Sequence, residues 1–100
     1  MNKLDKIVVI KGIQIPGLTA TLVKRTERVA MYLREDGYYE VGILQILPAQ
    51  IVFGKPYPER ERYWYTEEFG VVAKTTSDLK RAEEHYNDFV EHLKSLKKNP

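Results

Sequence analysis

The chain has 100 residues, of which 43% are hydrophobic and 30% are charged, a composition that fits one small globular domain with a single core. Its formal net charge of +2 excludes both the basic excess typical of a duplex-DNA binder and the acidic excess of a DNA mimic. Cysteine is absent, so disulfides and thiolate sites are excluded, and a reducing compartment suits the chain.

The N-terminal part of the chain lacks the pattern of a targeting or membrane segment. Its first apolar run, Ile7 to Ile10, is much shorter than the apolar stretch of a secretory signal, and no small-residue cleavage site follows. A membrane-spanning helix needs about 20 apolar residues. We therefore expect a cytosolic protein without membrane contacts, built as one domain over residues 1–100.

Three strands are predicted in the first third of the chain. The β-branched run Lys6–Ile10 is typical of a short buried strand. Glycine and proline in Lys11–Leu18 favour a loop or a bulged connection. Thr19–Thr26 predicts a second strand, and a tight connection at Thr26–Arg28 leads into a third strand at Val29–Arg34.

Asp36-Gly37 predicts a two-residue hairpin turn of type I′, because both central residues of that turn need positive φ. The following strand then covers about Tyr38 to Leu47 and ends at Pro48. The register that follows pairs Glu35 with Tyr38, Leu33 with Glu40, Met31 with Gly42 and Val29 with Leu44 on one face. On the other face it pairs Arg34 with Tyr39, Tyr32 with Val41 and Ala30 with Ile43.

The next segment is harder to assign. Ala49–Pro58 contains glycine and two prolines and is expected to be irregular. Arg60–Thr66 predicts an edge strand whose alternation places Arg60, Arg62 and Trp64 on one side and Glu61, Tyr63 and Tyr65 on the other. Gly70–Lys74 is a short apolar stretch that favours no single state.

A C-terminal helix is indicated by apolar residues at three- and four-residue spacing. They are Leu79, Ala82, Tyr86, Phe89, Leu93 and Leu96. Thr75-x-x-Asp78 resembles a capping box, although Thr76 or Ser77 could equally be the N-cap. The predicted fold class is therefore α+β, an antiparallel sheet of four to five strands with one C-terminal helix packed on one face.

One helix covers one face of a sheet, yet the predicted register places large side chains on both faces. Either a loop such as Gly12–Thr19 or Ala49–Pro58 covers the second face, or that face meets another protein. We expect a partner or a second copy to bind there through Tyr32, Tyr39 and Val41. The opposite assignment of the two faces stays open.

The run from Arg60 to Tyr65 interleaves arginine and aromatic side chains, which can anchor a protein partner or stack nucleic-acid bases. Candidate binding residues are Arg60, Arg62, Tyr63, Trp64 and Tyr65. The structural alternative is that Trp64 packs in the core and the tyrosines frame it.

No pattern in the sequence predicts catalysis, a metal or a cofactor. His85 and His92 are seven residues apart, which on a helix separates them by about 10 Å and favours a solvated polar face over a metal site. Four carboxylates, at Glu59, Glu61, Glu67 and Glu68, lie close to Arg60 and Arg62, which favours surface charge pairing over acid–base chemistry. Because catalytic motifs are also missing, we expect a non-enzymatic protein with no cofactor and no metal.

Part of the chain has a recognisable pattern. Phe-Gly-Lys-Pro-Tyr-Pro (53–58) is followed by an aromatic run ending in Glu68-Phe69-Gly70, a short apolar segment and a Thr/Ser-Asp-Leu helix start. This pattern resembles small, mostly uncharacterised proteins of bacterial phages and mobile elements. The resemblance implies an accessory role that inhibits or modulates a host protein, including a host defence system. The leading hypothesis is a protein-interaction module that binds a protein partner or a second copy of itself in a homodimer, and the alternative is a nucleic-acid binder that uses the Arg60–Tyr65 run.

Overall fold

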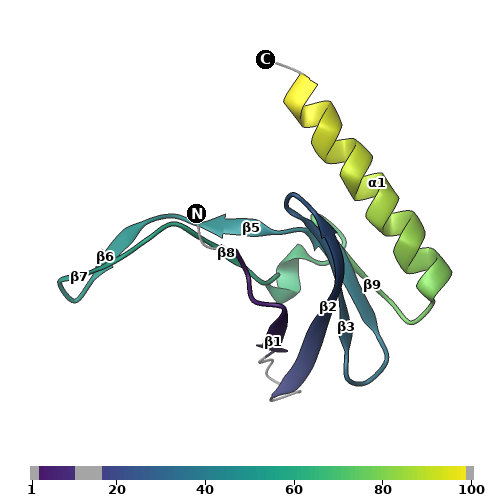
Figure 1. Cartoon of the computed structure of the whole chain (residues 1–100), viewed down its shortest axis with the longest axis horizontal. Coiled ribbons are helices and arrows are strands. Elements are labelled where there is room, and N and C mark those ends of the chain that lie inside the picture. The colour runs from purple at the N-terminus through teal and green to yellow at the C-terminus, as the bar shows by residue number, and fades with distance from the viewer. Residues whose placement is uncertain (1–2, 11–16, 99–100) are drawn as a thin grey trace.

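The computed structural model describes residues 3–10 and 17–98, which form a five-stranded antiparallel sheet, a helix and a projecting hairpin (Figure 1). Helix α1 (Leu79–Lys98) packs on one face of the sheet, so the predicted α+β class is confirmed. The loop expected at Lys11–Leu18 lies mostly outside the described residues. In the strand order β1-β2-β3-β4-β9, the strands are Ile7–Ile10, Leu18–Thr26, Val29–Arg34, Tyr39–Ile43 and Ala73–Thr76.

The β3–β4 hairpin closes through a longer loop than Asp36-Gly37 predicts. The N–H of Gly37 donates to the Arg34 carbonyl at 3.0 Å, and the N–H of Arg34 donates to the Tyr38 carbonyl at 2.8 Å. Gly37 has a φ of 93°, whereas Asp36 has no positive φ. This is the three-residue loop in which a type I turn is followed by a left-handed glycine.

The extra loop residue shifts the register of β4 by one, so the predicted pairing is wrong. Leu33 pairs with Tyr39, and Met31 pairs with Val41. A shift of one residue moves every side chain of a strand to the other face of the sheet. The aliphatic side chains of β3 and β4 therefore share the face on which α1 packs, in a cluster that contains Val29, Met31, Val41, Ile43, Ala82 and Tyr86.

The second face of the sheet is covered by residues 63–72, the segment that leads from the projecting hairpin to β9. This segment includes the short 3₁₀ helix η1 (Thr66–Glu68). Trp64 is 5% exposed, and its indole N–H donates to the Ile43 carbonyl at 2.9 Å. The cover therefore comes from residues that the sequence pattern assigned to an edge strand. They close a second core cluster of Ala20, Ala30, Tyr32, Leu44, Trp64 and Ala73.

Helix α1 starts at an N-cap provided by Asp78, whose carboxylate accepts the N–H of Lys80 at 2.9 Å. The capping box expected at Thr75 is therefore wrong. Thr76 instead accepts the N–H of Asp78 at 3.2 Å. The middle of the predicted apolar stripe packs on the sheet, whereas Leu79 and Leu96 at its ends are about half exposed. The C-terminal half of the helix extends past the sheet (Figure 1).

Residues 45–62 form a long hairpin, here called the arm, that projects from the sheet on the side away from α1 (Figure 1). The strand predicted to end at Leu47 is interrupted at Leu44, and the strand predicted at Arg60–Thr66 ends at Arg62. The segment expected to be irregular contains two strands of its own. The arm consists of β5 (Gln45–Leu47) paired with β8 (Arg60–Arg62), and β6 (Gln50–Val52) paired with β7 (Lys55–Tyr57).

Candidate functional site

The base of the arm is held on the sheet by a buried ion pair. The Glu61 side chain is 3% exposed, and its carboxylate accepts hydrogen bonds of 2.9 and 2.8 Å from the guanidinium of Arg25 on β2. It also accepts the backbone N–H of Leu4 at 2.9 Å. Burial acts to raise the pKa of Glu61, but these hydrogen bonds outweigh it and hold the pKa below its usual value. The surface pairing expected for Glu61 is therefore wrong.

The outer part of the arm exposes apolar side chains on both of its faces. Every residue from 48 to 59 is exposed. The register places Ile51 with Pro56 on one face, and Val52 with Lys55 on the other. Ile51 is 77% exposed and Phe53 is fully exposed. A two-stranded ribbon is marginally stable in water, so apolar residues here favour burial against another molecule.

The turn at the arm tip places its most exposed side chain on an unusual backbone. Phe53 has a φ of 52° and Gly54 a φ of 77°, as in the two-residue type I′ hairpin turn. That turn favours asparagine or aspartate at its first central position, whereas a bulky side chain there costs about 1–2 kcal/mol. Among the described residues, neither core cluster includes a side chain of the tip, so core packing does not compensate this cost. Such local strain is typical of functional positions.

The partner surface expected at Tyr32, Tyr39 and Val41 lies inside the domain. Tyr32 and Val41 are fully buried, and Tyr39 packs against the cluster under α1. The reason is the register shift, which moves Tyr39 and Val41 under the helix while Trp64 covers Tyr32. The Tyr32 hydroxyl donates to the Asp5 carbonyl at 2.6 Å, and burial raises the pKa of Tyr32 to about 12.

The Arg60–Tyr65 run does not form one open surface. Arg62 donates to the Glu68 carboxylate at 2.7 and 2.9 Å, and its guanidinium lies 3.7 Å from the centre of the Tyr65 ring. Arg60 lies over the ring of Tyr57, at 5.8 Å. Trp64 is in the core, as the structural alternative predicted, and Tyr65 is half exposed.

Tyr63 contributes to a buried polar cluster. Its hydroxyl donates to the carboxylate of Glu40 at 2.5 Å, and Glu40 also accepts a hydrogen bond of 3.3 Å from Thr75. Burial, reinforced by the Glu40 carboxylate, raises the pKa of Tyr63 far above its usual value. The cluster satisfies a carboxylate that the register shift places inside the second core.

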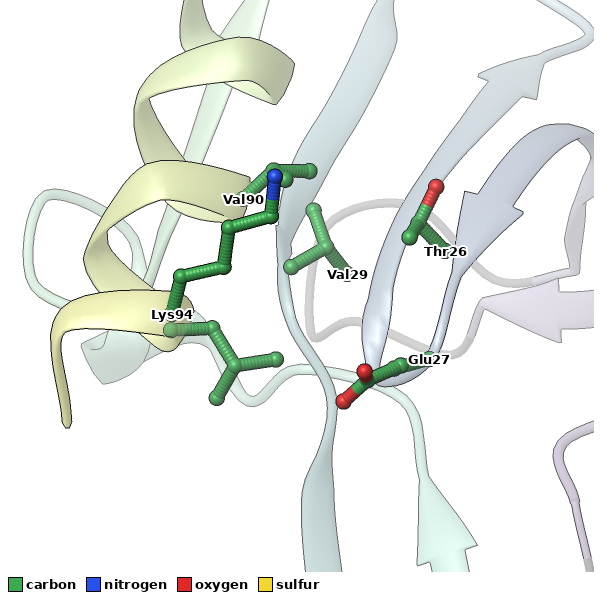
Figure 2. A pocket seen from close by; sticks show the side chains of 6 residues that line it. Thr26, Glu27, Val29, Val90 and Lys94 are labelled. Carbon is green, nitrogen blue, oxygen red and sulfur yellow. The ribbon is translucent and has the colours of Figure 1, made fainter. Parts of the chain in front are cut away.

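A shallow recess lies between the β2–β3 turn and the second half of α1 (Figure 2). Val29, Val90 and Leu93 form its apolar wall, and Thr26, Glu27 and Lys94 lie at its rim. Over residues 3–10 and 17–98, no three His, Asp or Glu side chains are placed to share a metal ion.

Comparisons with family models, curated proteins and solved structures found no match to this chain. None of the helices in the described part of the chain is long and apolar enough to cross a membrane. The candidate site is the exposed tip of the arm. The sequence pattern did not single out the tip residues Ile51, Val52, Phe53 and Tyr57, although β-branched and aromatic residues followed by Gly54 are typical of a strand that ends at a turn.

Proposed function

We propose that the protein is a non-enzymatic protein-binding module and that the arm is its binding element. The observation that carries the proposal is Phe53, a fully exposed aromatic side chain on a positive-φ turn at the end of a projecting ribbon. Aromatic side chains are the residues that most often anchor protein interfaces. The buried pair of Arg25 and Glu61 fixes the base from which the arm projects, so less ordering entropy is lost when the tip binds.

The charges of the arm favour a protein over a nucleic acid. Between residues 50 and 57 the tip carries one charged side chain, Lys55. Phosphate backbones require several free cations, and bases require exposed rings on which to stack. Arg62 is held by Glu68, and Trp64 is buried. Because the chain resembles phage and mobile-element proteins, we also propose that the protein bound by the arm is a host protein.

The proposal is tested by photo-crosslinking in cells that make the protein. In one variant a photoreactive phenylalanine analogue replaces Phe53. In the control it replaces Val71, which is 75% exposed and lies outside residues 45–62 of the arm. We expect discrete protein adducts from position 53 that are absent from position 71 and that resist nuclease. Equal patterns from the two positions, or nuclease-sensitive adducts, would overturn the proposal.

A further inference from the structure

The two edges of the arm tip differ in their capacity to pair with another strand. Val52 and Lys55 flank the two-residue turn, which makes them a hydrogen-bonded pair. The next pair, Ile51 and Pro56, is then non-hydrogen-bonded, and its backbone groups point away from the ribbon. Pro56 and Pro58 lack an N–H, so the outer edge of β7 offers no donor at these positions. The edge of β6 offers the N–H and the carbonyl of Ile51.

Prolines on an edge are a common protection against strand addition. Here they protect one edge of an exposed ribbon and leave the other open. The open strand, Gln50–Val52, has no charged side chain, and charged side chains are the other common protection. We propose that two copies of this chain pair through β6, antiparallel and centred on Ile51. This inference rests on the proposed function, in which the arm binds a protein, and names a second copy, in place of a host protein, as that partner.

Several features favour a second copy over a strand of another protein. Antiparallel self-pairing about Ile51 places Gln50 opposite Val52 of the second copy, so like charges are never opposed. The same register places the exposed Phe53 beside Ala49 of the second copy. The four strands then run β7, β6, β6 and β7, and both outer edges carry prolines. Assembly therefore stops at a two-fold dimer, the commonest closed symmetry.

The geometry also sets the strength of the association. Two ribbons that pair only at their tips bury less than the roughly 800 Å² per partner of a standard interface. We therefore expect a weak dimer that forms with rising protein concentration. The arms project from their sheets (Figure 1), which keeps the two domains apart while the tips pair.

Cysteine crosslinking tests the register, because the natural chain contains no cysteine. In a pair centred on Ile51, the two Cα atoms at this position lie about 5.5 Å apart, within the range of a disulfide. We expect Ile51→Cys to form disulfide-linked dimers about tenfold faster than Val71→Cys, an equally exposed control, because pairing raises the local thiol concentration. Gln50→Cys should form disulfide-linked dimers slowly, because residue 50 lies opposite Val52 of the second copy and the two thiols at position 50 are therefore not adjacent. Equal rates for all three variants would overturn the proposal.

Sedimentation of the unmodified chain completes the test. The wild type should show a concentration-dependent dimer, and Ile51→Pro should be monomeric with an unchanged melting temperature, because the tip packs on neither core cluster. A wild type that stays monomeric at every concentration would overturn the dimer. If discrete adducts of a different protein still form at position 53, the proposed function stands without it. If wild-type monomers bind vesicles of anionic lipid, the tip is a membrane anchor and the dimer is again overturned.

Discussion

Gly42 determines how closely β9 can approach β4. A Cβ atom at this position would lie 2.3 Å from the carbonyl oxygen of Val72 and 2.7 Å from the Cβ of Ala73. Backbone atoms cannot move aside as a flexible side chain can, so the two strands would have to separate. The close approach also brings Glu40 and Thr75 opposite each other, within hydrogen-bonding range.

Gly42→Ala should therefore destabilise the domain by about 1–3 kcal/mol through overpacking. Urea denaturation followed by tryptophan fluorescence measures the change, because Trp64 lies in the core next to β4. The control is Thr21→Ala, an exposed β2 position that should change stability by less than about 0.5 kcal/mol. An unchanged midpoint for Gly42→Ala would mean that β9 does not pack against β4 as described.

At the scale of elements, α1 depends on one capping residue and on a short contact with the sheet. Tyr86 of α1 shares a hydrogen bond of 2.6 Å with Thr26 of β2, and Lys24 forms an ion pair with Glu83. These contacts and the apolar stripe hold the first half of the helix. Its second half contacts the sheet less. The stability of the helix therefore depends mainly on its first half, where the N-cap lies.

Asp78→Ala should lower stability by about 1 kcal/mol, because the N–H of Lys80 loses its acceptor. Ser77→Ala is the matched control and should be nearly neutral, since the Ser77 side chain is exposed and is not the cap. Thermal melts followed by far-ultraviolet circular dichroism give both values. A larger loss for Ser77→Ala would move the N-cap back to one of the positions that the sequence left open.

At the scale of the whole molecule, the fold is a small body with two projections. The radius of gyration is 14.3 Å, above the roughly 13 Å expected for a compact chain of this length. The arm and the far half of α1 account for the excess (Figure 1). Glu61 connects three separate parts of the chain at the base of the arm: the segment before β1, β2 and β8.

Acidification tests this connection. Because the folded-state pKa of Glu61 lies below its usual 4.5, its ion pair stabilises the fold fully above that pH and is lost as pH falls through the folded-state pKa. Glu68, whose pKa is lowered by hydrogen bonds from Arg62, contributes in the same direction. Glu61→Gln should cost about 1.5–3 kcal/mol at neutral pH and should weaken the acid dependence of stability.

Urea midpoints between pH 7 and pH 3 measure both effects. Glu91→Gln is the control, because its ion pair with Lys94 is solvent-exposed and should contribute less than about 1 kcal/mol. If Glu61→Gln and the wild type lose stability in parallel as the pH falls, the Arg25–Glu61 pair does not hold the base of the arm.

The sequence by itself determined the fold class, most strands of the sheet and the C-terminal helix, because hydrophobic periodicity and β-branched runs are local signals. Only the tertiary structure decided the register of the β3–β4 hairpin, since Asp36-Gly37 fits two turn types and a single residue separates them. The extra loop residue decides whether Tyr39 and Val41 face the helix. The candidate site was also decided by tertiary structure: Trp64 packs in the core, whereas Phe53, equally apolar in sequence, is fully exposed at the end of the arm.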